Sequence, residues 1–109
     1  MAYSEELADR IRGVLAGRDK LSERKMFGGL AFMLSGNMAC GVIGDELMVR
    51  VGAEQQDSML AQPHARPMDF TGRPMKSMVY VGADGLESDA SLATWVGRGV
   101  DFATSLPPK

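Results

Sequence analysis

Apolar and polar positions at the start of the chain follow the period of an α-helix. The apolar stripe consists of Leu7, Ile11, Val14 and Leu15, which fall on one side of a helix. Ser4 precedes the stripe as a capping residue, and the two glutamates that follow it occupy the first turn, where the helix dipole favours negative charge. Gly17 is typical of a helix end. The pattern predicts a helix over residues 4–17, followed by a polar loop over 18–23.

Short apolar runs replace the helical pattern in the next part of the chain. Ser35-Gly36-Asn37 and Gly44-Asp45 are hairpin turn signals between such runs. Gly28-Gly29 indicates a bend or a bulge. Together these signals predict an antiparallel meander with strands near 24–28, 29–34, 38–43 and 46–51.

The region that follows has weaker patterns. A short helix is predicted over residues 53–61, with Met59 and Leu60 facing inward. Residues 62–74 contain three prolines and are expected to be irregular. A further strand is predicted over 77–81, and the glycines at both ends of residues 82–85 predict a turn.

A long helix is predicted at the end of the chain. Asp89 is placed to cap it, and it is expected to run to about Ser105, because two prolines follow shortly after. Its apolar positions follow the helical period and are Leu92, Trp95, Val96, Phe102, Ala103 and Leu106.

The order of the predicted elements is roughly α-β-β-β-β-α-β-β-α. Strands joined by tight hairpins run antiparallel. We therefore expect a two-layer α+β domain, with an antiparallel sheet and helices gathered on one face. The 109 residues match the size of one domain, 1–109, and 45% hydrophobic residues suffice to build its core.

The composition of the chain argues against several classes of protein, namely nucleic-acid-binding, disulfide-bonded, membrane-spanning and secreted proteins. The net charge is −2, whereas proteins that live on nucleic acid usually carry a strong positive charge. The single cysteine, Cys40, excludes an intramolecular disulfide and fits a reducing, cytoplasmic compartment. No apolar run approaches the length of a membrane span, and the polar, acidic start is unlike a signal peptide.

Several segments, in order along the chain, resemble one family. They are RKMFGGLAFMLSGNMACGV at residues 24–42, LMVRV at 47–51, PHARPMDFTGRPM at 63–75, and the Trp95-Val96 pair. Each segment alone is weakly specific, but together they cover most of the chain and resemble the N-terminal domain of the TfoX/Sxy competence regulators.

The resemblance implies a cellular process in which the protein takes part, but it does not imply a chemical reaction. Members of the family are associated with the regulation of natural competence in bacteria, and no enzymatic activity is attached to this domain. Its fold is similar to small α+β domains that include secretion chaperones, which bind other proteins. Longer members carry a second, C-terminal domain, which is not expected in a chain that ends at Lys109.

Candidate catalytic and metal-binding residues are few. Cys40 and His64 would form a nucleophile–base pair only within hydrogen-bond reach, and a cysteine in an apolar strand is more often a buried hydrophobe. Asp84, Glu87 and Asp89 lack the regular spacing of a calcium loop, and a turn plus a helix cap explains them better. We expect no catalytic site, no metal and no cofactor.

A basic loop is a candidate contact site for an anion or an acidic partner. Arg66, Arg73 and Lys76 lie within eleven residues, with Asp69 as the one acid. Other cations join this group if the fold brings them close, namely Arg24, Lys25 and Arg50. The ordinary alternative is a solvated loop whose arginines pair with neighbouring groups.

Methionine is unusually frequent, with nine residues in the chain. Strand alternation places Leu30 and Phe32 on one face, towards the helices, and Met33 and Met48 on the other. A face of methionines and small residues is an adaptable contact surface. The alternative is that these methionines fill gaps in the core or cover the sheet.

The favoured hypothesis is a non-enzymatic regulatory or protein-binding module, including self-association through the second sheet face. A nucleic-acid-binding domain that uses the local basic residues is the alternative, although no recognition motif is present and aromatic residues make up only 6% of the chain. An enzyme or a small-ligand binder needs a pocket that the sequence does not reveal.

Overall fold

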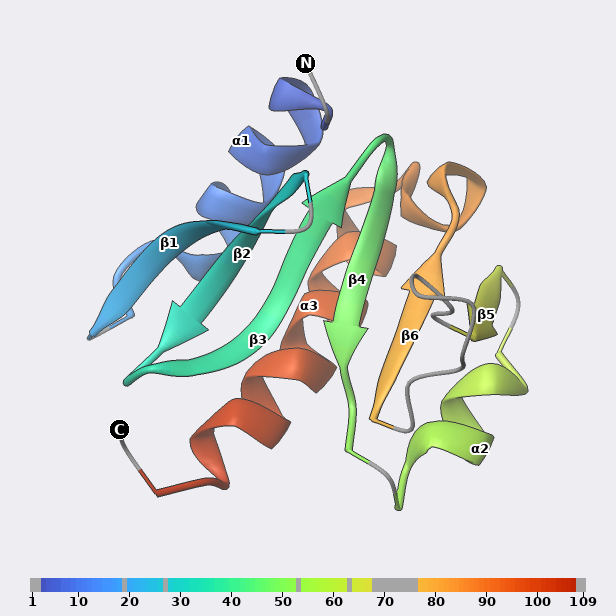
Figure 1. Ribbon diagram of the computed structural model, residues 1–109. Helices are drawn as coiled ribbons and strands as arrows, with labels where there is room; N and C mark the ends of the chain where they lie inside the picture. Colours follow the sequence, from blue (N-terminus) through green and yellow to red (C-terminus); the bar gives the residue numbers. More distant parts are fainter. Residues whose placement is uncertain are drawn as a thin grey trace.

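The computed structural model describes residues 3–18, 20–26, 28–52, 54–62, 64–67 and 77–107. Ten elements follow one another along the chain (Figure 1). They are α1 (Glu5–Leu15), β1 (Leu21–Met26), β2 (Gly29–Leu34), β3 (Asn37–Ile43), β4 (Glu46–Arg50), α2 (Gln56–Leu60), β5 (Ala65–Pro67), β6 (Met78–Val81), the 3₁₀ helix η1 (Ala83–Leu86) and α3 (Asp89–Thr104).

The six strands form one antiparallel sheet in the order β1-β2-β3-β4-β6-β5. Helices α1 and α3 cover one face of this sheet, and the short α2 lies at its β5–β6 end (Figure 1). The predicted two-layer α+β architecture is therefore confirmed. No helix in the described ranges is long and apolar enough to cross a membrane.

The predicted start and end of α1 are confirmed by its local geometry. The backbone N–H of Leu7 donates a hydrogen bond to Ser4 Oγ at 3.1 Å, which satisfies one of the unpaired donors of the first turn. The helix ends at Leu15, and Gly17 has a φ of +87°, a conformation that favours glycine. Of the apolar stripe, Leu7, Ile11 and Leu15 are buried in the core, and Val14 is partly buried against it.

Two tight hairpins connect the middle strands as predicted. Ser35 and Gly36 both have positive φ and join Leu34 to its partner Asn37. Gly44 and Asp45 join β3 to β4 in the same way, with a φ of +57° at Gly44. Two-residue turns with positive φ suit the right-handed twist of the flanking strands.

The prediction of a loop over residues 18–23 is wrong in its second half. Strand β1 begins at Leu21, opposite Leu34, and ends at Met26 rather than at residue 28. The reason is that β1 is an edge strand, which pairs through its backbone and carries exposed, charged side chains that show no apolar pattern.

Three other boundaries differ from expectation. Ser88 rather than Asp89 caps α3, because its Oγ accepts the backbone N–H of Ser91 at 3.0 Å. The region expected to be irregular contains β5, which pairs with β6 and stops at Pro67. The second helix is shorter than predicted, covering only Gln56–Leu60, and its Met59 and Leu60 are half-buried against the core.

A close approach fixes α3 against β3. Phe32 pairs with Cys40 and Met33 pairs with Met38, so Ala39 is an extra residue in β3. A Cβ atom on Gly99 of α3 would lie only 2.2 Å from the carbonyl oxygen of Ala39. The bulge and the glycine together allow the helix backbone to meet the strand backbone.

Strand alternation sorts the buried residues into two clusters, as predicted. Leu30, Phe32, Leu47 and Val49 lie in the main core, between the sheet and the helices. A second, smaller cluster lies on the other face and contains Ala31, Met38, Met48, Met78 and Tyr80, with Met33 and Ile43 at its border.

Candidate functional site

The cysteine and the histidine occupy different environments. Cys40 is completely buried in the main core, and burial raises the pKa of its thiol to about 12. His64 is exposed between α2 and β5, where its carbonyl accepts a hydrogen bond from Gly82. An enclosed, protonated thiol is a poor nucleophile, so this arrangement does not provide the reactive pair considered above.

The three acids near the start of α3 are not gathered around one point. Asp89 forms an ion pair with Arg10 of α1 at 3.3 Å, while Asp84 and Glu87 are exposed. Within the described ranges no group of three or more histidine, cysteine, aspartate or glutamate side chains is arranged to hold a metal ion.

The basic residues singled out from the sequence are spread across the sheet. Arg24 and Lys25 lie on β1 and Arg66 on β5, at opposite edges of the six strands. Five strand spacings of about 4.8 Å separate these edges by about 24 Å. Arg24 pairs with Ala31 and Lys25 with Leu30, so their side chains lie on opposite faces of the sheet. The condition under which Arg24 and Lys25 would join Arg66 is therefore not met.

Two of the candidate basic residues, Arg66 and Arg50, contact aromatic rings of neighbouring elements. Arg66 forms an ion pair with Glu46, and its guanidinium lies 4.5 Å from the centroid of the Tyr80 ring. Arg50 is half-buried, with its guanidinium 5.1 Å from the Phe102 ring of α3. The last two candidates, Arg73 and Lys76, lie outside the described residues.

The two candidate methionines differ in exposure. Met48 is completely buried, whereas Met33 is half-buried at the border of the second cluster. Met48 approaches the backbone of β3 so closely that a Cβ on Gly41 would lie 2.8 Å from its methyl group. In this conformation Met48 belongs to the interior, and of the two only Met33 reaches the surface.

A groove runs along one side of α3 and consists of three adjoining depressions, with volumes of about 580, 350 and 330 Å³. The first and second share Arg98, and the second and third share Val51, Gln55 and Phe102. We call this surface the α2–α3 groove, because α2 and the segments at its two ends form most of the opposite wall.

The side of α3 that lines the groove is set by helical spacing. Its lining residues include Ser91, Thr94, Arg98, Asp101 and Ser105, which are three or four positions apart and so fall on one side of the helix. At a rise of about 1.5 Å per residue, this stripe is about 21 Å long.

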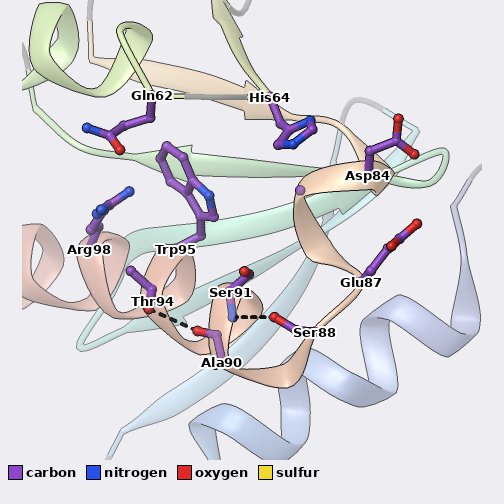
Figure 2. A pocket seen from close by; sticks show the side chains of 11 residues that line it. Gln62, His64, Asp84, Glu87, Ser88, Ala90, Ser91, Thr94, Trp95 and Arg98 are labelled. Atoms are coloured by element: carbon purple, nitrogen blue, oxygen red, sulfur yellow. Dashed lines mark hydrogen bonds between the residues drawn. The ribbon is translucent and has the colours of Figure 1, made fainter.

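Two aromatic rings lie along this side of α3, each next to an arginine. The guanidinium of Arg98 lies 4.4 Å from the centroid of the Trp95 ring, and Arg50 approaches Phe102 as described above. Figure 2 shows Trp95 between the helix and the segment that carries Gln62 and His64. Cation–π contacts of this kind hold a flexible arginine in a defined position.

The charges in the groove are mostly unpaired. Its lining contains one arginine, Arg98, and four acids, which are Glu54, Asp84, Glu87 and Asp101. All four acids are exposed, and none of them forms an ion pair with a described residue. Arg98 likewise has no hydrogen-bond acceptor in the described part of the chain, although its side chain is half-buried. The groove thus combines a fixed cation at its centre with acids towards both ends.

The prediction that Trp95 belongs to the core is confirmed, since its side chain is buried there, but neither Arg98 nor Asp101 is singled out by the sequence. One local signal was present, since an arginine three positions after a tryptophan in a helix lies next to the ring. The opposite wall has no such signal, because it comes from residues 51–64 and 84–88, which meet α3 only in the folded chain.

Comparison with known proteins gives one match. The model of the TfoX N-terminal domain family matches residues 14–103, which include β1 to β6, nearly all of α3 and most of the groove. Neither the curated proteins nor the solved structures contain a match to this chain. The family match spans well over half of the sequence and agrees with the resemblance read from its motifs, so the chain belongs to the TfoX N-terminal domain family.

Proposed function

We propose that this chain is a non-enzymatic regulatory module that acts by binding another protein, in the competence-related setting of its family. Family membership supports a regulatory role. The buried state of Cys40, the most nucleophilic type of side chain in the sequence, supports a role in binding rather than in covalent catalysis.

The observation that carries the proposal is the α2–α3 groove. It is about as long as the stretch of α3 from Ser91 to Ser105, and aromatic rings and unpaired charges line it. Aromatic and arginine side chains are enriched where proteins bind one another.

Binding to nucleic acid, the alternative, has weaker support. Of the candidate basic residues, Arg24 and Lys25 lie at one edge of the sheet and Arg66 at the other, and Arg66 is already paired with Glu46. A nucleic-acid surface needs cations that follow a phosphate backbone. We further propose a cytoplasmic location, which fits the single, reduced cysteine.

Affinity capture from an extract of the cells that make this protein tests the proposal. The immobilised chain is compared with the Asp101→Lys variant, which reverses a charge in the groove, and with Asp45→Lys, which makes the same change at an exposed hairpin turn. We expect a defined protein to be retained by the wild-type chain and by Asp45→Lys, and to be lost from Asp101→Lys.

The same preparations are tested for binding to labelled single- and double-stranded DNA over a series of salt concentrations. DNA binding that weakens steeply as the salt concentration rises, without capture of a protein, would overturn the proposal in favour of the nucleic-acid alternative. Capture of no protein and no DNA would also contradict it.

A further inference from the structure

We infer that the α2–α3 groove receives a positively charged segment of the partner protein, seated with its cations at both ends of the groove and a hydrogen-bond acceptor against Arg98 at the centre. This inference rests on the proposed protein-binding function and specifies the chemistry of the partner. Charge complementarity between the groove and its occupant is the basis for it.

The ends of the groove define where the partner's cations lie. Asp84 and Glu87 line one end, next to the start of α3, and Glu54 lines the other, with Asp101 between Glu54 and the central Arg98. These exposed carboxylates have no ion-pair partner in the described part of the chain. A concave surface lined mainly by one sign of charge concentrates ligands of the opposite sign. Lysine or arginine residues of a partner therefore satisfy both ends.

The centre of the groove requires an acceptor rather than another cation. Arg98 is held against the Trp95 ring at 4.4 Å, and its guanidinium makes no hydrogen bond to a described residue (Figure 2). A guanidinium carries five N–H donors in a fixed plane. A backbone carbonyl or a single carboxylate of the bound segment would accept hydrogen bonds from these donors, while the segment's apolar groups contact the Trp95 side of the groove.

The length of the groove sets the size of the occupant. The lining stripe of α3 measures about 21 Å. An extended chain covers this distance with about six residues, at about 3.3 Å per residue. The occupant is thus a short linear segment rather than a whole folded surface.

The same charges argue against nucleic acid as the occupant of this groove. Four carboxylates and one guanidinium line it, so a phosphate backbone would meet net repulsion along most of its length. A nucleic acid would have to bind elsewhere on the molecule.

The single tryptophan of the chain makes the inference directly testable. Trp95 lies in the groove, so its fluorescence reports occupancy of this site without a label. The probe is a tryptophan-free peptide of about eight residues built from lysine and leucine. The comparison probes are the same peptide with glutamate in place of lysine, and an oligothymidine of similar length.

We expect the lysine peptide to change the Trp95 emission in a saturable manner, with an affinity that falls as salt is added. Asp101→Lys should weaken this binding about tenfold, whereas Asp45→Lys should leave it nearly unchanged. Glu87→Lys, at the end of the groove next to the start of α3 and outside that helix, should weaken binding in the same way. It replaces Asp101→Lys if that variant does not fold.

Three results would overturn the inference. They are an unchanged emission with the lysine peptide, equal weakening by the groove and hairpin variants, and binding of the glutamate peptide or the oligothymidine at least as tight as that of the lysine peptide. If the lysine peptide binds but no cellular protein is captured, the inferred preference of the groove for cations is supported and the proposed protein-binding function is contradicted. Capture that survives Asp101→Lys would keep protein binding and reject this groove.

Discussion

The two sides of α3 differ in how completely their groups are satisfied. The core side is apolar and buried, and it meets β3 at backbone distance, where Gly99 faces the carbonyl of Ala39. The groove side carries unpaired Arg98 and Asp101 within one turn of each other, next to the Trp95 and Phe102 rings. The core side of the helix thus makes its contacts within the fold, whereas Arg98 and Asp101 on the groove side have no ion-pair partner among the described residues.

Two arginines illustrate the same difference. Arg12 of α1 donates to both carboxylate oxygens of Glu23, at 2.8 and 2.9 Å, and to Asp9 at 2.6 Å, so its donors are occupied within the fold. Arg98 has a ring beneath it and no acceptor among the described residues. We propose that a fixed but unpaired charge in the α2–α3 groove, rather than a charge as such, marks the surface that binds a partner.

The largest effect is expected on the core side of α3. Gly99→Ala would place a methyl group 2.2 Å from the Ala39 carbonyl oxygen, so helix and strand must separate. We expect the free energy of unfolding to fall by about 1–3 kcal/mol. Gly97→Ala is the matched control, because its Cβ meets nothing within 4 Å and alanine is the better helix former. It should stabilise the protein by about 0.5–1 kcal/mol. The free energy of unfolding is measured with denaturant. If both variants change it in the same direction, the close packing of Gly99 against Ala39 is contradicted.

A smaller effect is expected from Arg98→Ala on the groove side. Loss of the stacked guanidinium should lower the free energy of unfolding by only about 0.5–1 kcal/mol, the usual contribution of such a contact. The emission of Trp95 should shift to longer wavelength, because the ring loses its cover. Arg66→Ala removes a similar contact, to Tyr80 of β6 on the face of the sheet away from α3, and should leave the emission unchanged. An unshifted spectrum in Arg98→Ala would show that the two side chains do not stack in solution.

The smallest effect is expected from Glu23→Gln, which removes the charge opposite Arg12. The hydrogen bonds from Arg12 lower the pKa of Glu23 below its ordinary value of 4.5, so this pair stabilises the fold above that pH and loses its effect as the pH falls through the lowered pKa. Both side chains are about one-third exposed, and solvent screening limits the effect at pH 7 to about 0.5 kcal/mol.

The pH dependence of unfolding provides the measurement for this pair. The difference between wild type and Glu23→Gln should shrink towards zero below the pKa of Glu23. Glu87→Gln, at an exposed residue that forms no ion pair with a described residue, should show little difference at any pH. A difference in unfolding free energy between wild type and Glu23→Gln that grows as the pH falls would contradict a stabilising Arg12–Glu23 pair.

The hydrophobic periodicity of the sequence predicts the fold correctly where residues that contact one another are also close in sequence. Alternation placed Phe32 on the helix face and Met48 on the other, and the hairpin turns followed from Gly36 and Gly44. It failed for β1, because an edge strand held by its backbone does not need apolar side chains. It also misplaced the cap of α3, since Ser88 and Asp89 are adjacent residues of equally suitable types.

The candidate site was less accessible from sequence than the fold. Whether Arg24 joins the basic loop depends on strand order, which the sequence does not reveal, and strand order separates Arg24 from Arg66 by the width of the sheet. The groove was not foreseen, because residues 51–64 and 84–88, which are far apart in sequence, line it together with α3 only in the folded chain. Unpaired charge is a property of tertiary structure, and no local pattern encodes it.

Photo-crosslinking in the cells that make this protein tests the central claim most directly. A photoreactive amino acid replaces Thr94, which is exposed and lines the groove, or Thr104, which is exposed on the same helix and does not line it. Both threonines bond only to the backbone of their own helix, so they are matched in structural role. We predict a crosslinked protein of defined mass from position 94 and none from position 104. Equal products from the two positions, no product from position 94, or an adduct with nucleic acid there would contradict the claim that the α2–α3 groove binds a protein.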